Sequence, residues 1–291
     1  MISNSGNTFL SFLKLSKLKI MLPVSLTGFT GYFIFNPVLS ENIFLISAGI
    51  LLLASAASVL NQIQEVDIDR KMDRTLDRPI PAKKVSMKQA TLFFMICLLA
   101  GLTLVYSFGN LQSSIIGLIT ILWYNGVYTY SKRVTAFAVV PGAVTGALPF
   151  LIGWVAAGGA VFDRNIVFLE FLFFAGQIPH FWLLVMKYGE EYKAAGIPSL
   201  TDIFSIAQIS WLTFIWVLLS VVAAIFLCYF EIIHTVPIIS ILLVASVFIL
   251  WKFSGLLNAD KKKNNIAGYS ILLNLYFLLI LILLISDKIF S

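Results

Sequence analysis

The sequence predicts an all-α polytopic membrane protein with nine transmembrane helices, on the basis of its composition, its apolar segments and its charge distribution. Of 291 residues, 59% are hydrophobic and 12% are charged, and the mean hydropathy is +0.95, which excludes an ordinary soluble domain. About 20 apolar residues in a helix cross the hydrocarbon core of a bilayer. Nine such stretches lie near residues 18–36, 43–64, 90–108, 111–130, 135–157, 166–187, 207–229, 235–252 and 267–286.

The first of these stretches is expected to remain in the mature protein. The preceding residues, MISNSGNTFLSFLKLSKLK, lack the early charged region, short apolar core and small-residue cleavage site of a secretory signal. No linker or low-complexity tract interrupts the chain, so residues 1–291 are expected to form one domain.

The basic residues predict the orientation. With nine crossings, eighteen of the twenty Lys and Arg residues fall on one side, and only Arg164 and Lys288 fall on the other. Because Lys and Arg collect in short cytoplasmic loops, we expect a cytoplasmic N-terminus and an external C-terminus in a bacterial-type plasma (inner) membrane. The net charge of +6 then indicates affinity for anionic lipid headgroups, and we expect no nucleic-acid partner. Cys97 and Cys228 lie in apolar spans without metal or disulfide spacing.

The two longest predicted loops, about 65–89 and 188–206, are both cytoplasmic and acidic. Each follows a predicted helix, and four crossings separate them. This spacing predicts two tandem, pseudo-symmetric helix groups of like orientation.

The first loop begins with NQIQEVDIDRKMDRTLDRPIP, residues 61–81. If the helix continues beyond the membrane boundary, Asn61, Glu65 and Asp69 recur every four residues and share one face, whereas Asp67 points elsewhere. A solvated helix end is the alternative. Oxygen ligands suit Mg²⁺, which binds through one or two carboxylates plus substrate phosphates. Cations that suit a phosphate follow closely: Arg70, Arg74, Arg78, Lys83 and Lys84. Carboxylates and cations together favour a metal–diphosphate site.

The second loop region is GQIPHFWLLVMKYGEEYKAAGIPSLTD, residues 176–202. On a helix, Gln177, His180, Lys187 and Glu191 fall within about a quarter turn of one another. They predict a second constellation facing the first, and an interfacial loop without a site is the alternative.

A third polar face lies in WYNGVYTYSKR, where Asn125, Tyr128, Thr129 and Lys132 share one side of a helix. Hydrogen bonding between helices, with an interfacial aromatic belt, is the alternative. All three faces are expected at the cytoplasmic side, which favours one shared site.

These segments resemble a known family. The spacing of Asn61, Glu65 and Asp69 resembles the first acidic motif of the UbiA superfamily of intramembrane prenyltransferases. NQIQEVDIDRKMDRTLDRP resembles the form of that motif in its heme O synthase branch. YNGVYTYSKRVT resembles that family's fourth-helix segment, GALPFLIGW its fifth-helix segment, and QIPHFW with KYGEEYKAAGIP its sixth helix and second acidic loop. The segments follow the family's order across roughly residues 55–202.

The resemblance implies roles for individual residues. Asn61, Glu65 and Asp69 would hold Mg²⁺ and the diphosphate of a prenyl donor, and Glu191 would be a metal ligand in the second motif. Lys132 joins these four as a catalytic residue. The implied substrate-binding residues are Asp67, Arg74, Arg78, Asn125, Tyr128, Gln177, His180 and Lys187. Glu65 and Glu191 stand where family members more often carry Asp; Glu keeps the charge and the ligand chemistry and lengthens the side chain by one methylene.

The resemblance also implies a reaction. It is the Mg²⁺-dependent transfer of a farnesyl group from farnesyl diphosphate to the vinyl group of heme B, giving heme O for a terminal oxidase, with membrane lipids and oxidase assembly factors as further partners. His180 would ligate the heme iron or contact a propionate, and a hydrogen-bonded helix histidine is the alternative. An aromatic quinone precursor or other lipid acceptor, and a polytopic transporter with an ion site, are the alternative functions.

Overall fold

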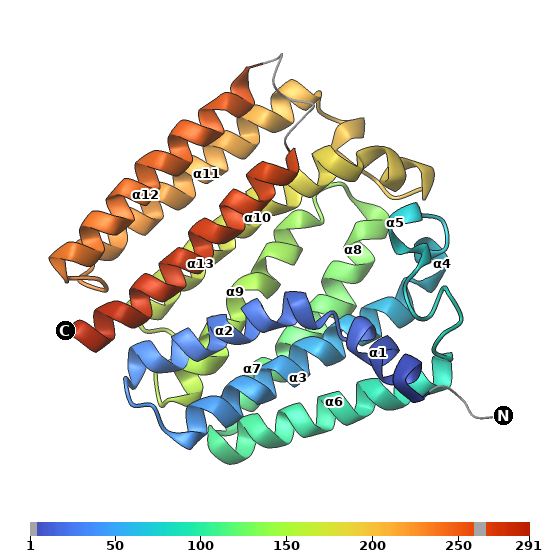
Figure 1. Cartoon of the computed structure of the whole chain (residues 1–291), viewed down its shortest axis with the longest axis horizontal. Helices are drawn as coiled ribbons and strands as arrows, with labels where there is room; N and C mark the ends of the chain where they lie inside the picture. The colour runs from blue at the N-terminus through green and yellow to red at the C-terminus, as the bar shows by residue number, and fades with distance from the viewer. Residues whose placement is uncertain (1–4, 259–265) are drawn as a thin grey trace.

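The computed structural model is a bundle of long α-helices, described for residues 5–258 and 266–291 (Figure 1). Eight helices in these ranges are long and apolar enough to cross a membrane, and each overlaps a predicted span. They are α2 (Leu18–Phe35), α3 (Glu41–Gln64), α6 (Met87–Phe108), α9 (Val139–Ala156), α10 (Arg164–Ala194), α11 (Ile206–Tyr229), α12 (Val236–Ser254) and α13 (Ile266–Phe290). The prediction of an all-α membrane protein is therefore confirmed.

The remaining predicted span, 111–130, which is the fourth in chain order, is built from three consecutive helical segments. α7 (Leu111–Leu122) leads into a π-helical turn, η1 (Trp123–Tyr128), and then into α8 (Thr129–Val134). Neither α segment alone has the length of a span, so the count of nine stays a prediction. The π turn carries Asn125 and Tyr128, and such turns occur frequently at functional sites.

Both predicted loops contain more helix than the sequence indicated. The first holds α4 (Val66–Asp69) and α5 (Asp73–Leu76). The second begins later than expected, because α10 runs without interruption to Ala194 and only then gives way to a short 3-10 turn, η2 (Leu200–Asp202). The predicted cytoplasmic loop near 188–206 therefore begins within α10, which continues beyond its apolar part, and its cytoplasmic location stays a prediction.

The buried apolar side chains form two large clusters. One joins α9 to α10, α11, α12 and α13, and the other joins α2, α3 and α6, with Ile152 and Ala156 of α9 packed against it. Figure 1 shows the corresponding division, with α10 to α13 on one side of α9 and α2, α3 and α6 on the other. The pseudo-symmetry of the two helix groups stays a prediction.

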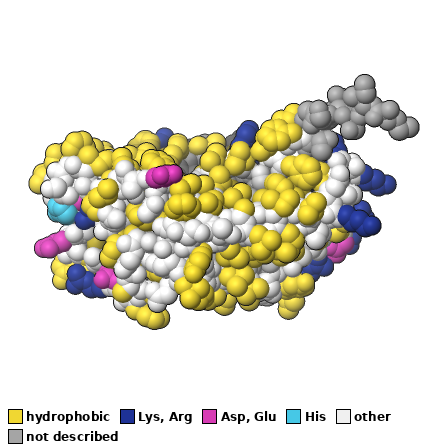
Figure 2. All heavy atoms as spheres, turned by 90° about the horizontal axis from the view of Figure 1, so that it is seen from below, with side chains coloured by type: hydrophobic (Ala, Val, Ile, Leu, Met, Phe, Trp, Pro, Cys, Tyr) yellow, Lys and Arg dark blue, Asp and Glu magenta, His cyan; other side chains and the backbone are white. Residues whose placement is uncertain are grey.

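The outer surface matches a membrane environment. In Figure 2 apolar side chains cover the middle of the visible face, and charged side chains lie toward its two ends. The predicted orientation remains a proposal, and three of the basic residues that support it, Lys261, Lys262 and Lys263, lie outside the described residues.

Glycines allow α2 and α9 to approach very closely. A Cβ added at Gly153 would overlap the backbone carbonyl oxygen of Gly28, and one added at Gly31 would overlap that of Phe150. Small residues at helix contacts permit such backbone approach in membranes, where packing replaces much of the hydrophobic driving force. The contact holds α9, a wall of the site described below, against the N-terminal helices.

Gly153→Ala should lower the thermal unfolding midpoint in detergent, because the added methyl must displace backbone and overpacking typically costs about 1–3 kcal/mol. Gly126→Ala is the matched control, since a Cβ at Gly126 meets no atom within 4 Å. An unchanged midpoint for Gly153→Ala would contradict the close contact.

Candidate active site

The acidic face at the end of α3 is buried. α3 ends at Gln64, and Glu65 is a non-helical joint (φ −105°, ψ 14°) before α4, so the helix does not continue unbroken as expected. The spacing of one turn is nevertheless kept, because Glu65 N donates to Asn61 O (2.9 Å) and Asp69 N donates to Glu65 O (2.8 Å). Asn61, Glu65 and Asp69 are 2%, 7% and 2% exposed. This burial argues against a solvated helix end.

Each buried carboxylate has a cationic partner from another segment. Lys132 Nζ lies 2.5 Å from Glu65 Oε1, and Arg78 Nη1 donates to both oxygens of Asp69 at 2.6 and 2.7 Å. We call these contacts the two ion pairs. Burial lowers the pKa of Lys132, and the adjacent Glu65 opposes that shift. An unpaired charge here would carry a large desolvation penalty, so the ion pairs fix α8 and the loop after α5 against α3.

Amide side chains fasten the π turn to α3. Asn61 Nδ2 donates to Thr129 Oγ1 (3.1 Å), and Asn125 Nδ2 donates to Ala57 O and Gln64 Oε1 (both 3.1 Å). The expected hydrogen bonding between helices is thus present. Asn125 was expected to bind substrate, but its amide nitrogen is engaged by α3. Its Oδ1 is buried without a protein partner, which leaves an acceptor for a water or a ligand.

Asp67 lies apart from the buried face, as the spacing predicted. Its side chain is 57% exposed and pairs with Arg133 at 3.0 Å. Partial burial acts to raise the pKa of this carboxyl, but the hydrogen bonds and charge of Arg133 outweigh it and hold the pKa below its usual value. The structure gives Asp67 no contact with the two ion pairs, so its expected substrate contact lacks structural support.

The extended end of α10 meets the first acidic segment through Arg74. Glu191 Oε2 accepts a hydrogen bond from Arg74 N (3.3 Å), and Arg74 Nη2 donates to the Tyr192 hydroxyl (3.2 Å). The Arg74 guanidinium also lies 4.5 Å from the centre of the Tyr188 ring. The two predicted cytoplasmic segments are therefore adjacent. Lys187 is exposed, and its ammonium lies 4.9 Å from the centre of the same Tyr188 ring.

A row of aromatic rings connects the ion pairs with His180. Ring centres of Tyr124 and Tyr128 lie 5.3 Å apart, those of Tyr128 and Phe181 lie 5.8 Å apart, and those of Phe181 and His180 lie 6.0 Å apart. His180 Nδ1 is 3.1 Å from Oδ1 of Asn274 on α13. The imidazole thus has a hydrogen-bond partner, as the alternative interpretation expected, and its second ring nitrogen has none among the described residues.

Gln177 and His180 share α10 but contact different helices. Gln177 packs against Gly146 of α9, whereas His180 contacts α13. The predicted single face therefore divides between two neighbours of α10.

Lys17 is a site residue that the sequence interpretation missed. It forms the joint between α1 (Ser5–Leu15) and α2 and has left-handed backbone angles (φ 51°, ψ 44°), which are uncommon for a residue with a Cβ. Gln62, which is fully buried, fixes this joint by donating from Nε2 to Leu15 O (2.6 Å). Residue spacing in the sequence does not predict this contact between Gln62 and Leu15.

The Lys17 ammonium lies within electrostatic reach of both ion pairs. Burial, together with the charges of Arg78 and Lys132, lowers its pKa to about 7. No carboxylate in the described part of the chain lies within ion-pair distance of this ammonium. Protonated Lys17 would therefore add a cation that is free to meet an anionic ligand.

The donor set fits Mg²⁺ only with help from a substrate. Within residues 5–258 and 266–291, no three His, Cys, Asp or Glu side chains converge as a metal site, so Glu65 and Asp69 are not joined there by Glu191. Two buried carboxylates one turn apart still offer hard oxygen ligands, and Mg²⁺ commonly combines one or two carboxylates with phosphate oxygens. The cations beside them suit the same phosphates.

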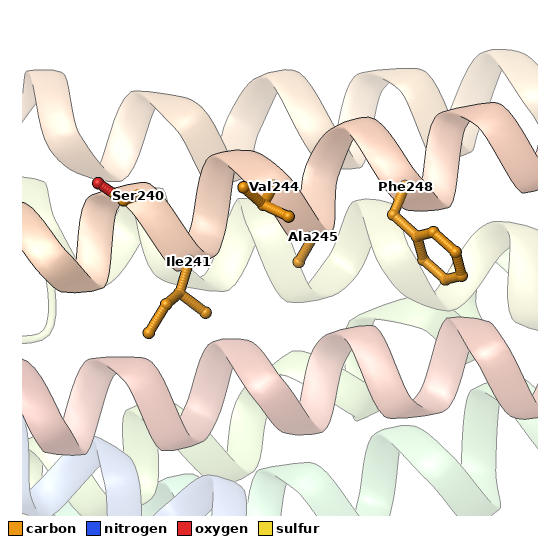
Figure 3. Close-up of a pocket in the computed structure, with 5 residues that line it drawn as sticks. All are labelled: Ser240, Ile241, Val244, Ala245 and Phe248. Carbon is orange, nitrogen blue, oxygen red and sulfur yellow. The ribbon is translucent and has the colours of Figure 1, made fainter.

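An apolar hollow on the surface of α12 is not part of this site. Figure 3 shows its lining: Ser240, Ile241, Val244, Ala245 and Phe248. All five residues come from α12 and none is charged, so the hollow offers nothing that would bind a diphosphate.

The chain is similar to proteins of a known family. The profile of the UbiA prenyltransferase family matches residues 23–283. The chain belongs to the UbiA prenyltransferase family. Curated relatives named protoheme IX farnesyltransferase include one from Geobacter sulfurreducens, 44% identical over 53% of this chain and 57% of that protein. Another, from Cytophaga hutchinsonii, is 32% identical over 66% and 68%. The alignments thus span about three fifths of the length of the first relatives, 57% and 62%.

Solved structures of UbiA proteins share the fold. A structure described as digeranylgeranylglyceryl phosphate synthase superposes with a TM-score of 0.77 at 21% identity, covering 98% of this chain and 99% of that one. A UbiA homolog from Archaeoglobus fulgidus, bound to DMAPP and Mg²⁺, gives a TM-score of 0.68 at 16% identity, covering 94% and 99%. At these identities the likeness shows the fold alone.

Arg78→Met should lower the unfolding midpoint, because it leaves the Asp69 carboxylate buried without its partner, and breaking a buried pair typically costs about 3–5 kcal/mol. Arg70→Met is the control, since Arg70 is exposed and makes no ion pair within the described ranges. Equal midpoints for the two variants, measured by thermal unfolding in detergent, would show that the Asp69 pair does not stabilise the fold.

Proposed function

We propose that the protein is a Mg²⁺-dependent intramembrane prenyltransferase that transfers a farnesyl group from farnesyl diphosphate to the vinyl group of heme B. One observation carries the proposal. Glu65 and Asp69 are buried in ion pairs with Lys132 and Arg78, and Lys17 lies within electrostatic reach, so that carboxylates suited to a metal and cations suited to phosphates lie together at one end of the bundle. Curated relatives named protoheme IX farnesyltransferase support the choice of substrates.

The cations account for activation of the donor. When the allylic C–O bond breaks, the diphosphate leaves with the bonding electrons. Lys132 and Arg78 are proposed to stabilise that growing negative charge, and protonated Lys17 would add a charge that has no carboxylate at ion-pair distance in the described part of the chain. Bound Mg²⁺ would supply further charge neutralisation at the phosphate oxygens. Glu65 and Asp69 are proposed to hold the metal.

The aromatic row accounts for protection of the reactive allylic cation. The rings of Tyr124, Tyr128 and Phe181 extend from the ion pairs into the bundle and keep water away from the donor carbon. The vinyl group of heme B forms the new C–C bond with its π electrons. Water then adds to the resulting cation and loses a proton, which gives the hydroxyethylfarnesyl group without any oxidant.

The acceptor is proposed to lie near His180. This imidazole is held by Asn274 through one nitrogen, so its other nitrogen is available to heme iron or to a propionate. An aromatic quinone precursor would have no use for an iron ligand here. A transporter would place polar groups near the middle of the bilayer, whereas the charges of this site lie at one end of the helices.

The decisive assay combines purified protein in detergent with heme B, farnesyl diphosphate and Mg²⁺, and uses mass spectrometry to detect heme O, with EDTA as the control. Metal-dependent heme O is the expected result. Release of diphosphate with unmodified heme would show that the acceptor is wrong. If neither product forms in folded protein, the prenyltransferase proposal fails and the transporter alternative gains support.

Asp69→Ala should abolish this turnover, because it removes a buried oxygen ligand and leaves Arg78 without its partner. Asp73→Ala is the matched control, because Asp73 is exposed and makes no ion pair in the described part of the chain. Wild-type turnover in the Asp69 variant would rule out the site assignment.

Lys17→Met should raise the KM for farnesyl diphosphate about tenfold, the effect of one lost charge-assisted contact of about 1.5 kcal/mol. Lys17→Arg should recover part of the loss, and Lys19→Met, at an exposed position two residues away, should match the wild type. A KM equally affected by Lys17→Met and Lys19→Met would exclude a specific role for Lys17.

A further inference from the structure

Two glycines of α9 lie directly beneath two expected substrate-binding side chains. A Cβ built on Gly142 would stand 2.7 Å from Cε2 and 2.9 Å from Cδ2 of Tyr128. A Cβ built on Gly146 would stand 2.5 Å from Cγ and 2.7 Å from Cδ of Gln177. Gly142 and Gly146 are one helical turn apart and so share one face of α9.

The side chains on this bare face end in polar groups without protein partners. Neither the Tyr128 hydroxyl nor the Gln177 carboxamide makes a hydrogen bond to another described residue, although the structure pairs many other polar side chains of the bundle. Neither polar group is fully enclosed by protein atoms, so both face accessible space. An unpaired polar group inside a membrane bundle is costly and commonly serves a ligand.

Tyr128 lies at the border between the charged and aromatic parts of the site. Its ring centre is 4.8 Å from Lys132 Nζ on one side and 5.8 Å from the ring centre of Phe181 on the other. Gln177 lies on α10 one turn before Phe181, and therefore on the same side of that helix. The two partners of the glycines thus line one continuous stretch of the site.

We propose that Gly142 and Gly146 are positioning residues, whose missing side chains let Tyr128 and Gln177 lie flat on α9 with their polar ends toward the substrates. Gly142 sets the Tyr128 ring beside Lys132, where the donor ionises, and Gly146 sets the Gln177 amide beside the acceptor. The proposal rests on the proposed prenyl transfer. It assigns this role to α9, a helix that supplies no charged or hydroxyl group to the two ion pairs.

A carbon placed 2.5–2.9 Å from another carbon is well inside van der Waals contact, so the ring or the amide must move. Protein interiors do not absorb such overlaps without shifts, and a displacement of about 1 Å at a reacting group can reduce the rate about 100-fold.

The test compares Gly142→Ala and Gly146→Ala with the wild type, using heme B, farnesyl diphosphate and Mg²⁺. For Gly142→Ala the expected result is a kcat reduced about tenfold or more, because a misplaced group weakens the transition state. The dissociation constant of farnesyl diphosphate should change less than about threefold, since Arg78 and Lys132 remain in place. For Gly146→Ala the KM for heme B should rise, with the donor affinity unchanged.

Double variants separate positioning from general packing damage. In a Tyr128→Leu background, which lacks the colliding ring atoms, adding Gly142→Ala should reduce kcat less than about twofold further. Gly146→Ala should likewise have little further effect in a Gln177→Ala background. Gly126→Ala, on the π turn but in open space, should match the wild type.

Gly101→Ala provides the folding control. Its Cβ would collide with Leu53 in the packing of α3 against α6, so it should lower the unfolding midpoint without the loss of kcat. A kcat loss of equal size in Gly101→Ala, or an undiminished effect of Gly142→Ala in the Tyr128→Leu background, would overturn the positioning role. Absence of turnover in the wild type would instead count against the proposed function itself.

Discussion

Two carboxylates buried at the end of α3 constrain the architecture around them. Removing Glu65 and Asp69 from water is tolerable only when each meets a positive charge, and the partners come from distant segments, Lys132 of α8 and Arg78 after α5. The π turn brings α8 to α3 and is held there by Asn61 and Asn125. The short helices α4 and α5 after α3, and α8 after η1, therefore bring together the groups that neutralise these two buried charges.

The same requirement explains why the site suits an anion. Lys132 and Arg78 pair with the two buried carboxylates, and protonated Lys17 would add a cation with no carboxylate at ion-pair distance in the described part of the chain. Arg74 lies where α5 meets α10, beside Glu191. A diphosphate carries more negative charge than one divalent ion neutralises, so a cation beside the site would offset part of the remainder. The row of aromatic rings from Tyr124 to His180 is proposed to give the prenyl chain a dry surface. Charge and hydrophobicity are thus separated along one path.

The sequence was sufficient for features that depend on local periodicity. Apolar length located eight spanning helices, and the four-residue spacing placed Asn61, Glu65 and Asp69 on one buried face. It was insufficient where distant packing decides. In the sequence Lys17 served only as one of the basic residues that predict orientation. The close contact between Gly142 and Tyr128 depends on how α9 packs against the π turn. Apolar length also ended before α10 does, since the helix continues to Ala194 through a segment whose Tyr188, Glu191 and Tyr192 contact Arg74.

The buried carboxylates and their cations are proposed to bind a metal–diphosphate pair. Isothermal titration of inorganic pyrophosphate into the purified protein, with and without Mg²⁺, tests this binding without any assumption about prenyl donor or acceptor. Binding should require Mg²⁺ in the wild type and should be lost in a Glu65→Gln, Asp69→Asn double variant that remains folded. Equal binding without Mg²⁺, or unchanged Mg²⁺-dependent binding in the double variant, would contradict this proposal.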